Sequence, residues 1–202
     1  MPVLLCDLGS VLFDCTLDRS IARWRETNGG HLGVGVVREL QDDAYRAFQA
    51  GRLGEAEYAR HLRARLEWQG SDEELIEIWN EAVGPIDLDV LALLRELRNE
   101  GWYLVAAANT NPWHEGRWRS LYSEALPVFH AVATSTVVGV GVPDPRFFAA
   151  ALRGVSATGP RLFVDGRPEN VSAARRSGLD GHLFRDAAGL RTACRALLAA
   201  VH

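Results

Sequence analysis

Hydrophobic residues recur at three- and four-residue spacings along the chain from residue 16 to residue 83. This period is that of a helix that buries one face. Turn-forming segments at 28–30, 51–54 and 70–72 divide the stretch into four parts, and the Ser-Asp-Glu-Glu sequence at 71–74 is typical of a helix start. The pattern therefore predicts four helices, whose apolar positions are Leu17, Ile21 and Trp24; Val36, Val37, Leu40, Ala44, Ala47 and Phe48; Tyr58, Leu62 and Leu66; and Leu75, Ile76, Ile78 and Trp79.

Strands and helices alternate in the rest of the chain. A short apolar strand covers residues 3–6, and further strands are expected at 102–107, 128–133, 161–164 and 181–184. Helices are expected at 90–100, 113–122, 145–153, 168–177 and 187–200. Alternation of this kind predicts an α/β fold with a parallel sheet covered on both faces. We expect a core domain of residues 1–14 and 86–202, with the four helices inserted as a cap at 15–85.

Composition narrows the range of partners and compartments. The chain has 202 residues, 48% of them hydrophobic, which is enough for one substantial core. Its net charge of −4 gives no basic surface for nucleic acid, so no such partner is expected. The first residues lead straight into a strand, which favours a soluble, cytoplasmic protein without a membrane partner. Cys6, Cys15 and Cys194 are too scattered to predict a disulfide framework or a zinc site.

The first predicted strand ends in a carboxylate. Asp7 is followed by Leu8-Gly9-Ser10-Val11, and α/β folds bind their ligands at the carboxyl ends of strands. This segment resembles the first motif of the haloacid dehalogenase (HAD) superfamily, Asp-x-Asp-Gly-Val/Thr, whose leading Asp attacks phosphorus to give an aspartyl-phosphate. The resemblance assigns the nucleophile to Asp7, whereas Gly9 occupies the position of the second Asp.

Two further motifs of the superfamily lack their functional side chain. The second motif has a Ser or Thr that bonds the phosphoryl group, and Ala108 stands there; Thr110 could replace that hydroxyl only if its side chain turned toward the site. The third motif has a Lys before Pro-Asp-Pro, and Val142 stands there. All 22 Lys and Arg positions are Arg, so no lysine can take over. The nearest cation, Arg146, is expected to face solvent from within a helix.

The fourth motif, a pair of acids that holds magnesium, is half present. Asp165 matches the first acid, Gly166 replaces the second, and Asn170 follows at the family's Asn position. Some members have Asp-Gly-x-x-x-Asp instead, and here Glu169 lies four residues after Asp165. A structural alternative is that Asp165 caps the amides of the following helix. If a metal binds, the resemblance places it on Asp7 and Asp165.

The resemblance covers essentially the whole chain. It implies a HAD-like Rossmannoid parallel-sheet core with an inserted four-helix cap, as in the branch that includes sugar-phosphate phosphatases and metal-free dehalogenases. It also implies a central first strand, with Asp7, Ala108, Val142 and Asp165 converging at its carboxyl edge. A carboxylate and a phosphate charge about 4 Å apart repel by about 4 kcal/mol at an effective dielectric near 20. Without the Lys and the full acid set, we expect no efficient Mg²⁺-dependent phosphatase activity and no cofactor, with weak Mg²⁺ binding at most.

Other polar residues are expected around the cleft between core and cap. The substrate-binding candidates are Gly9, Ser10, Ala108, Asn109, Thr110, Asn111 and the cap residue Arg38. His114 is a candidate catalytic acid, base or ligand beside Asp7 and Asp165, and the alternative is a helix position facing solvent. Burial and the missing Lys should raise the pKa of Asp7, and the neighbouring Asp165 should raise it further, so that the two acids could share a proton.

Two main classes of function are consistent with these residues. The first is an enzyme acting on a small molecule between cap and core, with Asp7 as a nucleophile or a general acid–base group. The second is a binding or regulatory protein that keeps the fold without catalysis and could form a homodimer through cap surfaces. Residual phosphatase activity on a small phosphorylated metabolite is a third alternative. A closed cavity lined by Asp7, Asn109 and His114 would favour the enzyme, and a cleft filled by side chains would favour the binding protein.

Overall fold

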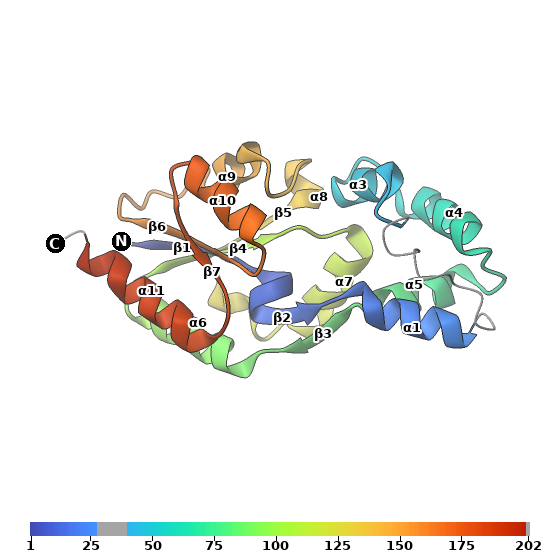
Figure 1. Ribbon diagram of the computed structural model, residues 1–202, viewed down its shortest axis with the longest axis horizontal. Coiled ribbons are helices and arrows are strands. Elements are labelled where there is room, and N and C mark those ends of the chain that lie inside the picture. The colour runs from blue at the N-terminus through green and yellow to red at the C-terminus, as the bar shows by residue number, and fades with distance from the viewer. Residues whose placement is uncertain (28–39, 201–202) are drawn as a thin grey trace.

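The sheet that carries the site has five parallel strands. The computed structural model describes residues 1–27 and 40–200. Its strands in the main sheet are β1 (Val3–Asp7), β4 (Tyr103–Ala108), β5 (Ala131–Thr134), β6 (Arg161–Asp165) and β7 (Asp180–Leu183). Their order is β5-β4-β1-β6-β7, and every neighbouring pair is parallel. The predicted central position of the first strand is confirmed, and the carboxyl ends of β1, β4 and β6 lie side by side (Figure 1).

Helices cover both faces of this sheet. One face packs against α6 (Leu88–Asn99) and α11 (Ala187–Ala199), and the other against α9 (Pro145–Ala151) and α10 (Pro168–Arg176). Side chains of a strand point to alternate faces. Leu4 and Cys6 of β1 therefore pack with α6 and α11. Val3 and Leu5 pack with α9 and α10. The predicted α/β core, covered on both sides, is confirmed.

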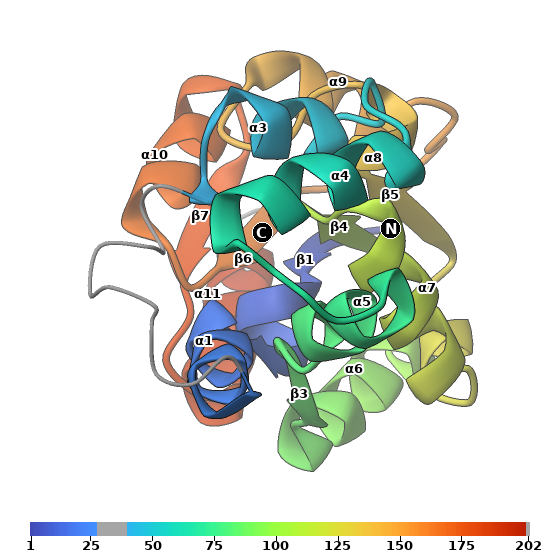
Figure 2. The same cartoon turned by 90° about the vertical axis from the view of Figure 1, so that its right-hand side faces the viewer.

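An antiparallel ribbon joins the core to the insertion. Its strands are β2 (Phe13–Cys15) and β3 (Val83–Ile86). Between them, the described residues form α1 (Leu17–Thr27), α3 (Asp43–Gln49), α4 (Glu55–Leu66) and α5 (Asp72–Asn80). These helices bury a separate core that includes Trp24, Phe48, Tyr58 and Trp79. Figures 1 and 2 show them as a second lobe beyond the carboxyl edge of the sheet.

The ribbon lies where the sequence analysis divides core from cap. The predicted limits of the two units, 14/15 and 85/86, both fall inside its strands. The Gly84-Pro85 sequence predicts a break, but the structure has strand β3 there. A two-stranded ribbon tolerates Pro85, because one edge of each strand has no partner that requires an N–H donor. The division of the chain into a core at 1–14 and 86–202 and a cap at 15–85 stays a prediction.

Hydrogen bonds hold the insertion against the core beside the site. The Ser135 hydroxyl, at the start of α8 (Ser135–Val138), donates to the carbonyl of Gln49 over 2.7 Å. Arg52 Nη1 donates to the carbonyl of Gly139 over 3.0 Å. The sequence pattern does not predict α8, because a single turn is too short to show a helical period. These contacts fix α3 over the carboxyl edge of the sheet (Figure 1).

Polar side chains start several helices. The predicted helix start at 71–74 is confirmed, and Ser71 and Glu74 form a reciprocal capping pair at the start of α5. Asn111 caps α7 (Pro112–Leu121), and Asp144 caps α9. The sequence patterns do not predict two short turns, the π-helical η1 (Leu8–Leu12) and the 3₁₀-helical η2 (Leu126–Val128). The second of these, η2, occupies the predicted start of β5. Across residues 1–27 and 40–200, no helix is both long and apolar enough to cross a membrane.

Candidate active site

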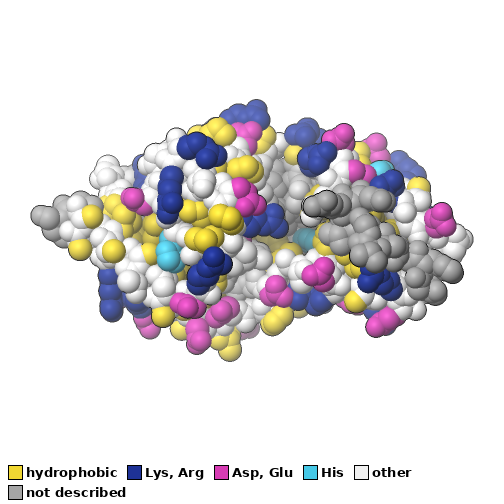
Figure 3. Space-filling model, viewed as in Figure 1, with side chains coloured by type: hydrophobic (Ala, Val, Ile, Leu, Met, Phe, Trp, Pro, Cys, Tyr) yellow, Lys and Arg dark blue, Asp and Glu magenta, His cyan; other side chains and the backbone are white. Residues whose placement is uncertain are grey.

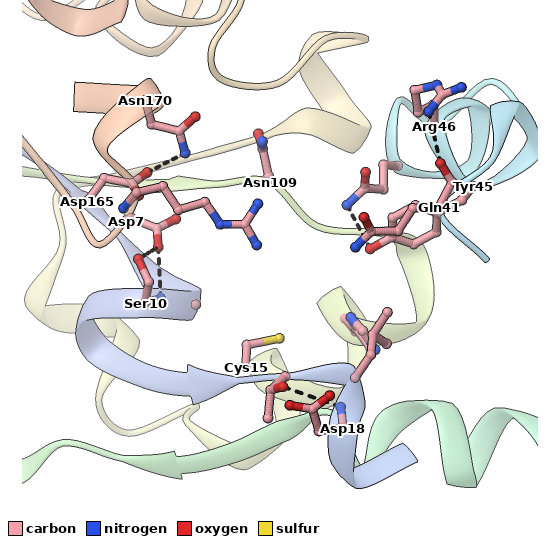
Figure 4. Close-up of a pocket in the computed structure, with 16 residues that line it drawn as sticks. Asp7, Ser10, Cys15, Asp18, Gln41, Tyr45, Arg46, Asn109, Asp165 and Asn170 are labelled. Carbon is pink, nitrogen blue, oxygen red and sulfur yellow. Dashed lines mark hydrogen bonds between the residues drawn. The ribbon is translucent and has the colours of Figure 1, made fainter. Parts of the chain in front are cut away.

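A cavity of about 390 Å³ lies between the carboxyl edge of the sheet and the insertion. Its core side is lined by Asp7, Gly9, Ser10, Asn109, His114, Asp165, Arg167 and Asn170. The ribbon and the insertion supply Cys15, Thr16, Leu17, Asp18, Gln41, Tyr45, Arg46 and Gln49. Figure 4 shows Asp7 and Asp165 on one side of this space and Tyr45 on the other, and Figure 3 shows a hollow between the two lobes. Polar groups from both lobes therefore face one partly open space.

Asp7 is held through one of its two carboxylate oxygens. It ends β1, and its Oδ2 accepts hydrogen bonds from the Ser10 amide over 2.8 Å and the Ser10 hydroxyl over 2.6 Å. Its Oδ1 accepts none from the described residues. Burial, with a smaller contribution from the charge of Asp165, raises the pKa of Asp7 to about 7, while the Ser10 bonds and Arg167 oppose the rise. The direction expected from the sequence therefore agrees with the surroundings of this carboxyl group.

Asp165 is bonded through both oxygens. It ends β6 and is 1% exposed. Its Oδ1 accepts from the Arg167 amide over 2.7 Å, and its Oδ2 accepts from Asn170 Nδ2 over 2.8 Å. Burial raises the pKa of this carboxyl group, and the two bonds oppose the rise. The capping alternative is wrong, because Asp165 bonds the amide of Arg167 before the helix and α10 starts without a side-chain cap. Glu169 is exposed and outside the cavity lining.

Ser10 connects the two strand ends. Its hydroxyl donates to Asp7 and accepts from the Gly166 amide over 2.9 Å. A Cβ atom at position 166 would lie 2.9 Å from the Ser10 Oγ and Cβ atoms, too close for an unshifted structure. A second acid therefore does not fit at this position beside Ser10. At Gly9 a Cβ would lie 3.2 Å from the Cys15 Cβ, which is also tight.

Positive charge reaches the cavity from arginines. Val142, at the position of the missing Lys, is 7% exposed and packs in the core under α9 and α10. Arg146 is exposed and bonded to Asp144, as expected from the sequence. Arg46 lines the cavity but is paired with Asp43. Arg167 also lines the cavity and is the arginine nearest in sequence to Asp165.

The electrostatic influence of Arg167 extends across the cavity. It lowers the pKa of Asp7 on the core, of Cys15 on the ribbon and of Tyr45 on the insertion, in each case against a larger rise caused by burial. The guanidinium group has no hydrogen bond or ion pair with any side chain in the described ranges. The cavity therefore contains a guanidinium group whose N–H donors no side chain in those ranges uses, close enough to Asp7 and Asp165 for the charges to interact.

The residues after β4 divide between the cavity and the core behind it. Asn109 lines the cavity, and its Nδ2 donates to the carbonyl of Val142 over 2.6 Å. Ala108, Thr110 and Asn111 are outside the lining, and Thr110 and Asn111 are buried polar residues. The Thr110 hydroxyl accepts from Trp118 Nε1 over 3.2 Å, so it does not replace the missing hydroxyl.

Three of the predicted substrate-binding residues lie outside the cavity lining, and their assignment stays a prediction. Asn111 Oδ1 accepts from the His114 amide to start α7, so this side chain is used by the fold. Thr110 points into the core, and Ala108 has no polar side chain. Gly9, Ser10 and Asn109 remain candidates, and Arg38 lies outside the described residues.

His114 borders the cavity but both of its ring nitrogens are engaged. Its Nε2 lies 3.0 Å from the carbonyl oxygen of Trp79, which can only accept, and its Nδ1 lies 3.1 Å from Asn111 Nδ2. The ring is 6% exposed and stacks on Trp79. Burial lowers the pKa of His114 to about 4. The solvent-facing alternative is wrong, because the ring is buried and bridges α7 and α5. The catalytic role of His114 stays a prediction, which the engagement of both ring nitrogens does not favour.

The sequence patterns did not identify several of the residues that line the cavity. Arg167 stands directly after Asp165-Gly166, so its position at a strand end was a usable signal. Gln41, Tyr45 and Gln49 carry no such signal, because helical spacing does not show which side chains will face the core across a cleft. Figure 4 shows Gln41 and Tyr45 on the side of the cavity opposite Asp7.

Two carboxylates remain for a metal. Among residues 1–27 and 40–200, no group of three or more His, Cys, Asp or Glu side chains could hold a metal ion. Mg²⁺ is commonly bound by one or two carboxylates together with substrate phosphate and water. Asp7 and Asp165 therefore suit a weak site that the substrate completes, where Mg²⁺ would neutralise negative charge. The assignment of metal ligands stays a prediction.

Comparisons with known proteins identify the fold. No protein-family model matches the chain. The HAD family enzyme BT-2542 from Bacteroides thetaiotaomicron superposes with a TM-score of 0.78 at 22% identity, over 92% of this chain and 94% of that one. A predicted HAD-like family hydrolase from Porphyromonas gingivalis gives 0.69 at 23% identity, over 90% of each chain. L-2-haloacid dehalogenase from Xanthobacter autotrophicus gives 0.62 at 17% identity, over 89% of this chain and 75% of that one.

The chain therefore has the HAD superfamily fold, as its motifs implied. The Bacteroides enzyme is also known in a complex with magnesium and inorganic phosphate. The Xanthobacter dehalogenase is also known with chloropropionic acid covalently bound. These ligands belong to those two proteins.

Proposed function

We propose that this protein is a HAD-fold hydrolase that uses Asp7 as a nucleophile on a small substrate in the cavity. The observation that carries the proposal is the asymmetry of Asp7: Ser10 holds one oxygen, and the other has no bond from the described residues. An oriented nucleophile with a free oxygen is the arrangement that covalent catalysis requires. The cavity lined by Asp7, Asn109 and His114 also favours an enzyme over a protein whose cleft is filled.

The substrate should have a leaving group that departs without a proton. Gly9 has no side chain that could protonate a departing alkoxide, and His114 has no free ring nitrogen. General acid catalysis at these positions is therefore absent. A halide leaves as a stable anion, so a small halogenated acid fits these residues better than an alkyl phosphate. The chloropropionic acid complex of the structurally similar dehalogenase supports this choice.

The reaction then has two balanced steps. Asp7 Oδ1 forms a bond to the substrate carbon, and the carbon–halogen bond breaks as the halide leaves with its electron pair. Water adds to the Asp7 Cγ atom, and the Cγ–Oδ1 bond breaks. The product leaves as an alcohol that contains the former Oδ1, while Asp7 takes its new oxygen from water. One proton is released, and Asp165, whose carboxyl pKa burial raises, can accept it.

A second candidate is hydrolysis of a small phosphorylated metabolite with Mg²⁺ held by Asp7 and Asp165. The magnesium and phosphate complex of the structurally similar Bacteroides enzyme supports it. Bound Mg²⁺ would neutralise charge between the carboxylates and the phosphoryl group. The absent Lys and the Ala at position 108 oppose it, because the phosphoryl group then lacks two of its usual partners.

The test compares 2-chloropropionate with 4-nitrophenyl phosphate, each in EDTA and in Mg²⁺. We expect chloride release in EDTA, reduced by at least about 1,000-fold in Asp7→Asn. Glu169→Gln is the matched control, because Glu169 is exposed in the same segment as Asp165 and lies outside the cavity lining. In a single turnover in isotopically labelled water, mass spectrometry should find the label in the peptide that contains Asp7.

Other outcomes separate the alternatives. Phosphate release only in Mg²⁺ would support the second candidate and contradict the first. No turnover of either compound, with a ligand that still binds in the cavity, would support a non-catalytic binding protein.

A further inference from the structure

The cavity contains a free guanidinium group beside two buried carboxylates. Arg167 lines the cavity and is exposed to it. The other arginines near this space are paired: Arg46 with Asp43, and Arg146 with Asp144. For Arg167, the described residues provide no partner through the side chain. A cation left without a protein partner in a cavity is available to a ligand.

We propose that Arg167 binds the carboxylate of a small monoanionic ligand and orients it over Asp7. This assignment deepens the proposed function, because it names the anionic group of the substrate, and it rests on that function only for the chemical steps after binding. Guanidinium presents a planar fork of donors that matches the two oxygens of a carboxylate. Arg167 would thus supply the positive charge that is absent at Val142.

The backbone fixes Arg167 next to the reacting group. Its amide donates to Asp165 Oδ1 over 2.7 Å, and Pro168 follows as the first residue of α10. The adjacent Gly166 amide donates to the hydroxyl of Ser10, which holds Asp7. The Cα atom of Arg167 is therefore tied to both acids through short hydrogen-bonded connections. Its side chain starts from a defined point at the edge of the cavity.

The balance of charge favours one negative charge on the ligand. Asp7 and Asp165 place two carboxyl groups at the edge of the cavity, and Arg167 is the one arginine of the described lining whose side chain has no hydrogen bond or ion pair. It can therefore attract one further anionic group. A phosphate dianion would add a second negative charge. The other arginine of the described lining, Arg46, is already paired with Asp43 and does not oppose that charge. Carboxylate is therefore the class that these side chains fit best.

The experiment measures binding of propionate and of inorganic phosphate by isothermal titration calorimetry in EDTA. The proteins are wild type, Arg167→Gln, Arg167→Lys and the control Arg176→Gln, which removes an exposed arginine from the same helix, α10. We expect Arg167→Gln to weaken propionate binding by at least about tenfold. Arg167→Lys should recover part of the loss, because it keeps the charge and loses the planar fork. Arg176→Gln should stay within about twofold of wild type.

Each remaining outcome would overturn one part of the proposal, either the role of Arg167 or the carboxylate class of the ligand. Equal propionate affinity in wild type and Arg167→Gln, or no propionate binding by wild type, would overturn the assignment of Arg167. Tighter binding of phosphate than of propionate in EDTA would overturn the carboxylate class. Circular dichroism checks folding, and if Arg167→Gln fails to fold, the Arg167→Lys variant still reports the loss of the fork.

The same titration with Asp7→Asn separates this inference from the proposed function. That variant cannot form the covalent intermediate, and removing a negative charge should strengthen propionate binding. If the wild-type protein binds propionate through Arg167 but turns over neither 2-chloropropionate nor 4-nitrophenyl phosphate, the hydrolase proposal is refuted and the anion site is retained. If turnover depends on Asp7 and the KM of Arg167→Gln equals that of wild type, the hydrolase proposal is retained and the assignment of Arg167 is refuted.

Discussion

At the scale of single residues, the Asp7–Ser10 pair determines what the nucleophile can do. Ser10 donates two hydrogen bonds to Asp7 Oδ2 and thereby stabilises the ionised carboxylate. Burial and Asp165 act in the opposite direction and are stronger, since the pKa of Asp7 rises to about 7. The nucleophile is therefore only partly ionised at neutral pH, and small changes around it should change its reactivity.

Substrate turnover in EDTA should increase as the pH rises through about 7, because only ionised Asp7 can attack. Ser10→Ala removes a bond that stabilises the ionised form, so the midpoint of the pH–rate profile should move to higher pH. The rate at pH 7 should fall by roughly tenfold. Initial rates from pH 5 to pH 9 measure both effects. Ser172→Ala, an exposed serine of α10, is the control, and equal profiles for all three proteins would contradict the proposed balance.

At the scale of elements, α7 connects the two lobes. Trp118 of this helix packs in the core, and Trp113 packs in the aromatic core of the insertion. His114 joins the start of α7 to the end of α5 through the Trp79 carbonyl. The Trp79 carbonyl also accepts from the Ser20 hydroxyl and the Ala82 amide, whereas the buried Asn111 Nδ2 depends on His114 Nδ1. A buried donor that loses its acceptor destabilises the folded state, so the ring should contribute measurably to stability. His114 thus supports the wall of the cavity from behind.

His114→Leu should lower the free energy of unfolding by about 1–3 kcal/mol at pH 7.5, because it removes the bond to the Trp79 carbonyl and leaves the buried Asn111 Nδ2 without its acceptor. Urea denaturation measures this loss. Arg119→Gln, which removes a partly exposed ion pair with Glu115 on the same helix, should cost less than about 1 kcal/mol.

The pH dependence of the same pair of proteins gives a second check. The pKa of folded His114 is about 4, below the ordinary value of 6.5, so the unfolded chain takes up a proton first as the pH falls. The advantage of wild type over His114→Leu should be full above about pH 6.5 and shrink toward pH 4. A constant difference across this range would show that His114 titrates normally and is not enclosed as described.

At the scale of the whole molecule, the two lobes enclose a site that destabilises the folded protein at neutral pH. Two acids at neighbouring strand ends are buried by the insertion, and burial raises the pKa of both. Each lobe has its own apolar core, so the acids are not needed for packing. Retaining an unfavourable pair of acids in an enclosed polar cavity is typical of a functional site.

Asp7→Asn should therefore stabilise the protein in EDTA. A folded pKa above the unfolded one means that the stability linked to Asp7 is full below about pH 4 and is lost as the pH rises toward about 7. The variant should exceed wild type by roughly 2–4 kcal/mol at pH 8 and by little at pH 4. Urea denaturation at the two pH values measures the difference. Mg²⁺ should narrow it if the ion binds the ionised pair, and an Asp7→Asn variant less stable than wild type at pH 8 would contradict the argument.

The sequence by itself determined the order of the elements and the residues at the strand ends. Apolar strand segments and helical patterns are local, so they predict the five-stranded α/β core, the helical insertion and the helix start at 71–74 without knowledge of the fold. Asp7 and Asp165 directly follow apolar strands, and parallel strands share a carboxyl edge. Their common location could therefore be predicted.

Only the tertiary structure decided what the neighbouring polar side chains do. His114 is buried because Trp79, 35 positions earlier in the chain, supplies a carbonyl and a ring to it. Thr110 points away from the cavity because Trp118 bonds its hydroxyl, and Tyr45 faces the site because α3 is fixed over the sheet edge. Helical spacing gives a residue's place on its own element. Its partner on another element depends on how the two elements pack, and that information is in the three-dimensional contacts of the chain.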